Sequence, residues 1–515
     1  MAFLPALLAV GLLAHCGGDD TDTVDNGVPS PDAGGAGDDA SMTRTEPADG
    51  QTPVTTTEAS TTGDGSVPPT GPCSGLPGSI VYVESGDTQE NLLKNIGRQL
   101  RDQANITLVF NLTGSCTLTN DIYTGAPVVP NGVLKYIPST AESPTWTASQ
   151  PEATCTTGAA GVPVDVAISA LFVDSCGLGG PPAGSNLALI QGPIQAYTFV
   201  VPAASTETAI TAAEAYYAFG FGNNNPLSPP DPWNNENFLF IRPTTKSTLV
   251  ATAKNIGVPP TKWKGVQESA SNDVVNAVTN STMPQATLGI LGAEVYDADR
   301  GKGIKTLAFE AYGQSAAYYP DSTSTAIDKQ NLRDGHYTLW SPTVYITKVE
   351  GDGSDRPTNP AVAYLTDLVL GDATTAPDGG ASAIDGLADV VKVGLIPQCA
   401  MKVTRSTDGG DLSPYTPPAP CGCYYASQVP VGKAAPTGCA ACTTSAECSD
   451  GGGSCNHGFC EPDQMPTLPI PADGGACFSG TPTTNADLVN ACTGAASIVK
   501  SVTLPAADGG LEPLP

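Results

Sequence analysis

The stretch NFLFIRPTTKSTLVATAKNIG, residues 237–257, predicts a strand, a polar turn and a helix in that order. The apolar run 238–241 is typical of a buried strand, and apolar residues then recur at helical spacing from Leu249 to Ile256. Gly257, followed by two prolines, ends this helix, which we expect to begin near Ser247 or Thr248.

The turn of this unit is a candidate ligand site. A strand that leads into a helix leaves unpaired backbone N–H groups and the positive end of the helix dipole at the turn. Arg242 and Lys246 lie beside that end, so the sequence predicts a corner that favours an anion or another oxygen ligand. The alternative stays open, since many strand-turn-helix units of α/β proteins bind nothing.

An earlier stretch, SIVYVESGDTQENLLKNIGRQLR from Ser79 to Arg101, has the same design. Residues 79–83 predict a strand, and an apolar stripe predicts a helix; the stripe consists of Leu92, Leu93, Ile96 and Leu100. Two such helix starts suggest a cleft. Asp87 in the turn also suits a helix N-cap, with Glu90 three residues further on.

Further strands are predicted at 106–112, 164–173 and 192–202, and the alternation with helices favours a mostly parallel sheet. The last of these, 192–202, is strongly apolar and is interpreted as a crossover into a second lobe. Thr211 and Glu214 form a capping box for a helix that runs through Phe219 and closes at Gly220. Ser271 or Asn272 caps a short helix, and ATLGILGAEVYD, residues 286–297, is predicted as a strand.

Composition limits the function. The chain has 515 residues, which suffices for one large or two medium domains, and its formal net charge is -29. Such an acidic surface argues against nucleic acid and anionic membranes as partners.

The N-terminal region predicts export. An apolar run from Ala2 to Ala14 is too short to span a bilayer but suits a signal peptide. The sequence Leu13 to Cys16 resembles a bacterial lipoprotein cleavage box in which Cys16 is lipidated, with an ordinary secretory signal as the alternative. Residues 17–72 are rich in Asp, Thr, Gly, Pro and Ser, so we expect an acidic, disordered tether.

The cysteines also indicate an oxidising compartment. The chain has 15 cysteines, and without Cys16 an even number remains for disulfides. The candidate disulfide cysteines are Cys73, Cys116, Cys155, Cys176, Cys399, Cys421, Cys423, Cys439, Cys442, Cys448, Cys455, Cys460, Cys477 and Cys492. Their density after Cys399 predicts a small module that is held together by disulfides. The last cysteine, Cys492, is expected on a helix that begins at Asp487. Zinc at the CxxC pair is the competing interpretation.

Several phrases carry a family resemblance: GPIQAYTFVVP, AYYAFGFGNN, IGVPPTKWKGV, LRDGHYTLW, LIPQCAMKV and CNHGFCE. With the order of the elements, they resemble the phosphate-binding proteins of ABC importers, which have the two-lobed type II periplasmic binding fold. They are more closely similar to myxobacterial secreted proteins that add a Dickkopf-like cysteine-rich tail. The resemblance covers roughly residues 79–510.

The resemblance implies a ligand site between two lobes. Its first turn corresponds to Ser85, Gly86, Asp87 and Thr88, where a carboxylate replaces a hydroxyl. The family's Ser-Asp pair corresponds to Ser169 followed by Ala170, so the accepting carboxylate is absent. In the third element Arg242 and Thr248 match, while Lys246 and Ser247 replace the family's Ser and Gly. Because few contacts remain, tight phosphate binding is doubtful.

Catalysis is not expected. Arg333, Asp334, His336 and Tyr337 gather in one phrase, but such a group is more often a hydrogen-bonded structural corner. Asp297 and Asp299 hint at calcium but lack the downstream glycine and glutamate of an EF-hand. We predict no cofactor and no metal site.

The sequence therefore predicts an α/β protein: a two-lobed type II periplasmic-binding-protein-like domain with a small disulfide-rich C-terminal module. The expected boundaries are a signal at 1–16, a linker at 17–72, the binding domain at 73–398, the cysteine-rich module at 399–465 and an extension at 466–515 that packs back. Lobe 1 takes about 73–190 and 300–398, and lobe 2 about 192–299. The expected function is an exported, lipid-anchored protein of the periplasm or outer surface that binds a small polar or anionic ligand. The alternative is a surface structural or adhesion protein without a ligand.

Overall fold

The computed structural model describes residues 71–227, 232–351, 354–429, 438–448, 453–461, 477–505 and 510–515. The predicted signal peptide, Cys16 and all but the last two residues of the predicted linker lie outside the described residues. Within the described part, none of the helices combines the length and apolar character needed to cross a bilayer.

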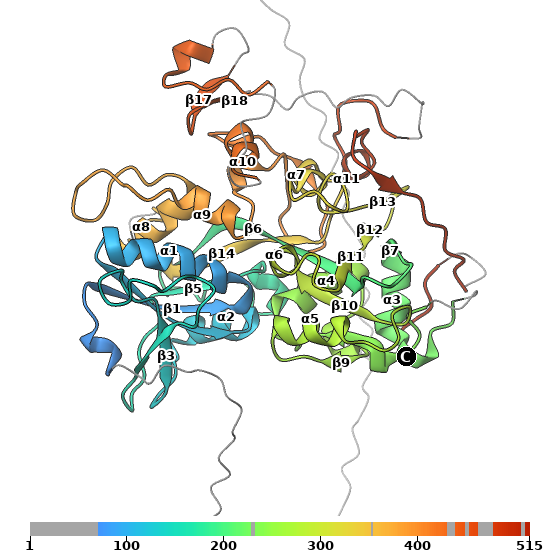
Figure 1. The fold of residues 1–515 in the computed structure, drawn as a ribbon, viewed down its shortest axis with the longest axis horizontal. Helices are drawn as coiled ribbons and strands as arrows, with labels where there is room; N and C mark the ends of the chain where they lie inside the picture. The colour runs from blue at the N-terminus through green and yellow to red at the C-terminus, as the bar shows by residue number, and fades with distance from the viewer. Residues whose placement is uncertain are drawn as a thin grey trace, which may run out of the picture. The chain divides into compact units, whose positions relative to one another are not determined.

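An 11-stranded sheet forms the centre of the fold, in the order β4-β3-β2-β1-β5-β14-β6-β10-β8-β9, with β11 paired to β6 (Figure 1). Its strands are β1 (Ser79–Gly86), β2 (Ile106–Thr113), β3 (Val133–Tyr136), β4 (Ala153–Thr156), β5 (Val166–Ser169), β6 (Leu187–Pro202), β8 (Leu239–Ile241), β9 (Val266–Gln267), β10 (Leu288–Gly292), β11 (Ile304–Thr306) and β14 (Trp340–Lys348).

The first lobe is built on β1 to β5. Strand β1 pairs in parallel with β2 and β5, whereas β3 and β4 are antiparallel. The lobe's helices are α1 (Glu90–Gln103), α2 (Ser115–Thr124), α8 (Pro360–Leu370) and α9 (Gly386–Lys392). The apolar stripe predicted for α1 is buried against this sheet, because Leu92, Leu93, Ile96 and Leu100 are at most 2% exposed.

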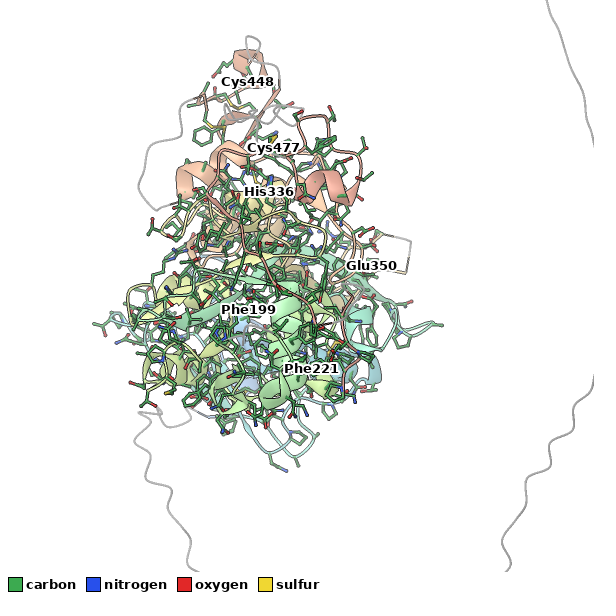
Figure 2. The ribbon with its side chains drawn as sticks, turned by 90° about the vertical axis from the view of Figure 1, so that its right-hand side faces the viewer. Phe199, Phe221, His336, Glu350, Cys448 and Cys477 are labelled. Carbon is green, nitrogen blue, oxygen red and sulfur yellow. A yellow bond between two sulfur atoms is a disulfide. The ribbon has the colours of Figure 1, made fainter. Side chains whose placement is uncertain are left out.

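The second lobe is built on β8, β9 and β10, which are parallel to one another. Its helices are α3 (Ala212–Phe221), α4 (Ser247–Ile256), α5 (Ser271–Thr279) and α6 (Ala293–Ala298). The predicted unit at 237–257 is confirmed: β8 leads into α4, which begins at Ser247 and ends at Gly257 with a left-handed φ of 77°. Aromatic rings fill the core of this lobe, with Phe199 and Phe219 stacked at 6.0 Å; Figure 2 labels Phe199.

The long strand β6 joins the lobes (Figure 1). Strand β6 pairs with β14 up to Ala196 and with β10 from Tyr197 onward, so one strand belongs to both lobes. The predicted crossover is therefore confirmed, as is the two-lobed α/β class, with the disulfide-rich C-terminal part described below.

Three predicted boundaries are wrong. Helix α3 continues to Phe221 and closes at Gly222, because Phe221 is also buried in the core. Strand β10 stops at Gly292, and the second half of the predicted strand is helix α6, whose Ala293 and Tyr296 are buried at helical spacing. The helix α5 is capped at Ala270, where the Asp273 side chain accepts from the backbone.

Fourteen cysteines form seven disulfides, which supports the prediction of a disulfide-rich C-terminal part. The pairs are Cys73–Cys155, Cys116–Cys176, Cys399–Cys421, Cys423–Cys439, Cys442–Cys455, Cys448–Cys460 and Cys477–Cys492. Figure 2 labels Cys448 and Cys477, two cysteines of this region. The elements here are β15 (Val403–Thr404), β16 (Ser413–Pro414), α10 (Gly422–Gln428), β17 (Ser454–Asn456), β18 (Phe459–Glu461) and α11 (Asn485–Val489). Cys492 follows α11 and is not on it, contrary to the prediction.

The last residues contact the second lobe. A four-stranded sheet joins β7 (Ala209–Thr211), β12 (Ala308–Glu310), β13 (Ala317–Tyr318) and β19 (Ser497–Ile498). The hydroxyl of Tyr216 donates to the carbonyl of Glu512 at 2.7 Å, and the Glu512 N–H donates to the Tyr217 hydroxyl at 2.9 Å. The chain end is thus anchored on α3.

Candidate functional site

The predicted helix starts do approach each other, and Asp87 connects them. The Asp87 carboxylate pairs with Nη2 of Arg242, and its Oδ1 lies 3.4 Å from Nζ of Lys246. Arg242 directly follows β8 and is fully buried, while Asp87 directly follows β1 of the first lobe. A charged pair therefore joins the two lobes at the predicted site.

The predicted N-cap role of Asp87 is wrong. Asp87 begins a short 3-10 turn, Asp87–Gln89, and α1 starts at Glu90 without a side-chain cap. The carboxylate cannot cap the helix because it is turned toward the second lobe and bound there. Sequence spacing cannot detect this choice, since Arg242 lies 155 residues away.

The remaining predicted hydroxyl residues are buried, and two of them bond to the backbone of nearby residues. Ser85 is fully buried and its hydroxyl donates to the carbonyl of Gly86. Ser169 caps a turn, with its hydroxyl bound to the backbone of Leu171 at 3.1 Å. Thr88, Ser247 and Thr248 are also buried. These hydroxyl groups are therefore withdrawn from solvent, whereas the side chains of Asp87 and Lys246 keep 20% and 16% exposure.

Backbone packing keeps the lobes in contact beside the ion pair. The N–H of Cys116 at the start of α2 donates to the carbonyl of Thr245, in the turn before α4, at 3.3 Å. A Cβ at Gly114 would lie 2.6 Å from the same carbonyl oxygen. Lys246 also donates to the carbonyl of Thr113 at 2.9 Å. Only glycine permits this close approach of the two backbones.

A cavity of about 630 Å³ lies elsewhere between the lobes. One wall is the polar stripe of α1, including Asn91, Asn95 and Gln99, and the facing wall comes from α6. Trp146, Tyr425 and Gln428 also line it, so α10 of the disulfide-rich region contributes, as does the end of α9 with Val391 and Lys392. The volume falls in the range of small-molecule sites.

Two of the lysines that line this cavity are paired with carboxylates. Lys94 lies 2.6 Å from Glu152, and Lys329 lies 2.7 Å from Asp297. The Arg98 guanidinium lies over the ring of Trp146 at 5.6 Å and donates to backbone carbonyls. Beside these charged groups, the walls present side-chain amides, two aromatic rings and aliphatic side chains. Such a lining suits a polar ligand without a strong net charge.

Glu294 is an unusual member of the cavity wall. It is 3% exposed, and its Oε2 accepts from Gln195, whereas Oε1 has no hydrogen-bond partner among the described residues. Burial raises the pKa of this carboxyl from 4.5 to about 8, and Asp87 and Asp297 add to the rise. The group is therefore protonated near neutral pH. The sequence analysis missed it because it lies in a predicted strand.

The group around His336 is a structural corner. His336 is fully buried, and its Nε2 lies 2.8 Å from the carbonyl oxygen of Ala491; Figure 2 labels it deep in the molecule. Arg333 donates to the carbonyl of Ala400, and Asp334 pairs with Lys402 at 2.8 Å. These contacts attach residues 330–337 to the C-terminal part.

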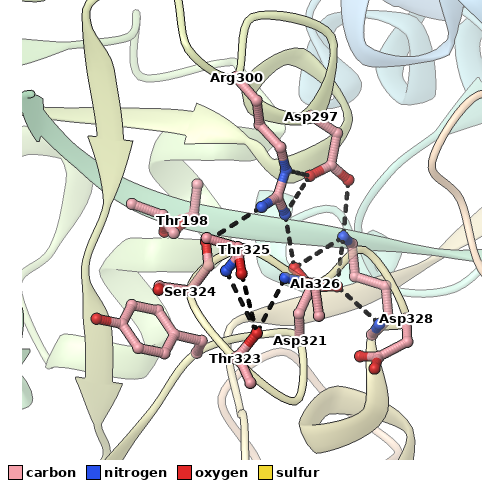
Figure 3. A network of polar contacts seen from close by, with 12 residues as sticks. Thr198, Asp297, Arg300, Asp321, Thr323, Ser324, Thr325, Ala326 and Asp328 are labelled. Carbon is pink, nitrogen blue, oxygen red and sulfur yellow. Dashed lines mark hydrogen bonds and ion pairs between the residues drawn. The ribbon is translucent and has the colours of Figure 1, made fainter.

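Asp297 and Asp299 are engaged in ion pairs. Asp297 belongs to a buried cluster with Arg300, Asp321 and Lys329, in which Arg300 lies 2.8 Å from Asp321 and Lys329 lies 3.0 Å from Asp321 (Figure 3). Asp299 pairs with Lys302 at 2.6 Å. Both carboxylates therefore have cationic partners from the chain itself.

In the tail, the sulfur atoms of Cys442, Cys448 and Cys460 lie within 4.8 Å of one another. Each belongs to a disulfide, so none is a thiolate ligand in this structure. The His457 ring lies 5.6 Å from that of Tyr424. These contacts agree with a stapled module.

Asp408 is a further buried charge that the sequence analysis missed. It accepts from the backbone N–H of Phe172 at 3.1 Å and from the hydroxyl of Ser341. Burial raises its pKa to about 6, opposed by these bonds and by Arg405. Asp408, in the segment after Cys399, thus contacts a loop of the first lobe at Phe172 and strand β14 at Ser341.

No family model matches the chain, and no curated protein matches it. Solved structures do resemble it. One is described as a putative phosphate ABC transporter substrate-binding protein with bound phosphate from Clostridium perfringens. The two sequences are 10% identical, the match covers 62% of this chain and 99% of that chain, and the TM-score is 0.40. An ABC-type phosphate transport receptor from Vibrio cholerae has 13% identity, covers 62% of this chain and 100% of that chain, and has a TM-score of 0.39.

The OxyR regulatory domain of Pseudomonas aeruginosa is also similar, with 10% identity over 53% of this chain and 89% of that chain and a TM-score of 0.29. Likeness to solved structures at this level of identity does not specify a ligand.

Proposed function

We propose that this protein is an exported, two-lobed solute-binding protein that holds a small polar ligand in the cavity between its lobes. The observation that carries the proposal is the cavity of about 630 Å³, whose walls come from α1, α6 and α10. Amides that donate and accept, beside the rings of Trp146 and Tyr425, suit an uncharged, hydroxyl-rich or amide-bearing molecule.

The expected anionic ligand at Arg242 and Lys246 is less well supported. Asp87 already neutralises part of their charge, and a second anion beside it would be repelled. We therefore assign the ligand to the cavity and not to the predicted helix starts. The chain acts as a receptor without catalysis.

Export is supported by the disulfides, since seven bridges are typical of oxidising compartments. Lipidation at Cys16, the predicted domain boundaries and kinship with myxobacterial proteins that carry a Dickkopf-like tail belong to the same proposal. The transporter or sensor partner is not specified by these features.

A thermal-shift screen with sugars, polyols, amino acids and phosphate tests the function. A ligand at about 100 times its dissociation constant adds about 2.7 kcal/mol to the free energy of unfolding. Asn95→Leu, in the cavity wall, is expected to abolish the shift caused by the active compound. Asn272→Leu, at an exposed position of α5, is the matched control and should retain it.

A second function, a surface scaffold without ligand, is favoured by the Asp87 pair that closes the lobes. If no compound raises the unfolding midpoint, or if Asn95→Leu responds as the wild type does, the receptor proposal is wrong and the scaffold remains.

A further inference from the structure

The Asp87 carboxylate is held by three donors of the second lobe. The first is Nη2 of Arg242, just after β8. The others are Nζ of Lys246, 3.4 Å from Oδ1 of Asp87, and the hydroxyl of Ser271 at the start of α5, 3.4 Å from Oδ2. A carboxylate from one lobe thus occupies a cluster of donors on the other. A free oxyanion would offer the same kind of acceptor atoms to this cluster.

The donor cluster is not saturated by Asp87. The Arg242 side chain is fully buried, its Nη1 donates to the carbonyl of Glu268 at 2.7 Å, and its Nε has no hydrogen-bond partner among the described residues. A carboxylate has two oxygens, whereas phosphate and sulfate have four. Asp87 leaves the buried Nε–H of Arg242 without an acceptor, and a further oxygen of a tetrahedral anion could accept from it.

Solvent reaches the cluster from the side of Asp87. The side chain of Asp87 is 20% exposed and that of Lys246 is 16% exposed, whereas Arg242 is at 0%. An ion could therefore reach the donors if the carboxylate were absent. With Asp87 in place, a dianion would meet a like charge, and Glu268 and Asp273 nearby add to the repulsion.

We propose that Asp87 occupies an oxyanion site of the second lobe as a built-in anion and thereby excludes free phosphate and sulfate from the protein. Asp87 is thus a specificity-determining residue, and its removal creates a tetrahedral-oxyanion site at Arg242, Lys246 and Ser271. The proposal is independent of the ligand proposed above, because none of these residues lines the cavity of about 630 Å³.

The test is a gain of binding. Asp87→Ser removes the charge and clears the space, and Asp87→Asn removes the charge alone. Titrations of the complete mature chain with phosphate and with sulfate, at ionic strength held constant with chloride, are followed by calorimetry and by the thermal midpoint. We expect Asp87→Ser to bind at least one anion at least about tenfold more tightly than the wild type does.

Controls separate the site from general charge effects. Asp299→Ser, which removes another ion-paired aspartate of the second lobe, should respond to the anions as the wild type does. Asp87→Ser combined with Arg242→Ala should lose the gain. If Asp87→Ser is unfolded in chloride, phosphate or sulfate must restore its fold where equal ionic strength of chloride does not.

The proposal is overturned if neither Asp87 variant gains anion binding, if anions fail to restore an unfolded variant, or if the wild type binds them equally well. A sugar, polyol or amino acid that binds in the thermal-shift screen does not change these outcomes for phosphate and sulfate, and neither does a screen in which none of these compounds binds. Failure of this proposal is therefore distinguishable from failure of the proposed function.

Discussion

Replacing Glu294 with glutamine is expected to stabilise the protein at alkaline pH. Glu294 lies in α6 beside Gln195 of the crossing strand, and burial raises its pKa from 4.5 to about 8. Glutamine keeps the volume and an oxygen that can accept from Gln195 but carries no ionisable proton. The substitution therefore removes only the conflict between burial and charge.

The sign and size follow from proton linkage. The native state holds the proton of Glu294 more tightly than the unfolded chain does, so its stabilising contribution is complete below about pH 4.5 and is lost as pH rises through about 8. Each pKa unit corresponds to about 1.4 kcal/mol, so the full loss is about 5 kcal/mol. Roughly two thirds of it, about 3 kcal/mol, has already occurred at about pH 7.

Urea unfolding of wild type and Glu294→Gln at about pH 5, 7 and 9 measures this difference. We expect similar stabilities at the lowest pH and a growing advantage of the variant above it. Glu142→Gln is a control of opposite sign: burial opposes the shift, but hydrogen bonds from Ser139 and the charge of Arg101 lower its pKa. A constant difference between wild type and Glu294→Gln at all three pH values would refute the reasoning.

Three further perturbations test the packing. Lys329→Met should destabilise the fold by about 3 kcal/mol in chemical denaturation, because it leaves the buried Asp321 with fewer cations, and adding Asp321→Asn should recover most of the loss. Gly114→Ala should lower the thermal midpoint by an amount equivalent to about 1–3 kcal/mol, since its Cβ would lie 2.6 Å from a backbone oxygen of the other lobe. An unchanged midpoint would contradict that packing. Serine at Cys477 and Cys492 removes a bridge that spans 15 residues and should cost about 3 kcal/mol, with faster hydrogen exchange in that segment but not in α1.

The local elements of the fold were predictable from the sequence. The apolar stripe of α1 and the periodic apolar residues of α4 specify helices with one face that packs against a sheet. Gly257 ends α4, as predicted, and has a left-handed conformation. The apolar run in β6 marked the crossover for the same reason. The even number of cysteines after Cys16 implied complete bridging but left the partners undetermined.

Residue patterns could not show which polar group meets which. Asp87 followed three residues later by Glu90 suits a helix N-cap, yet the carboxylate of Asp87 instead binds Arg242, which lies 155 residues away in the chain. The sequence could not predict Glu294, Asp408 or the cavity either, because each depends on segments distant in the chain that pack together. The packing of these distant segments decides which charged or hydrogen-bonding partner each polar side chain has.

The sequence alone determined the helices, the crossing strand, the acidic character of the chain and its oxidised cysteines, because these depend on periodicity and composition. Only the tertiary structure decided that the predicted anion corner already holds an internal carboxylate and that the open cavity between the lobes is elsewhere. The physical reason is that Coulomb and hydrogen-bond energies depend on distances in space and on burial, which residue order does not specify.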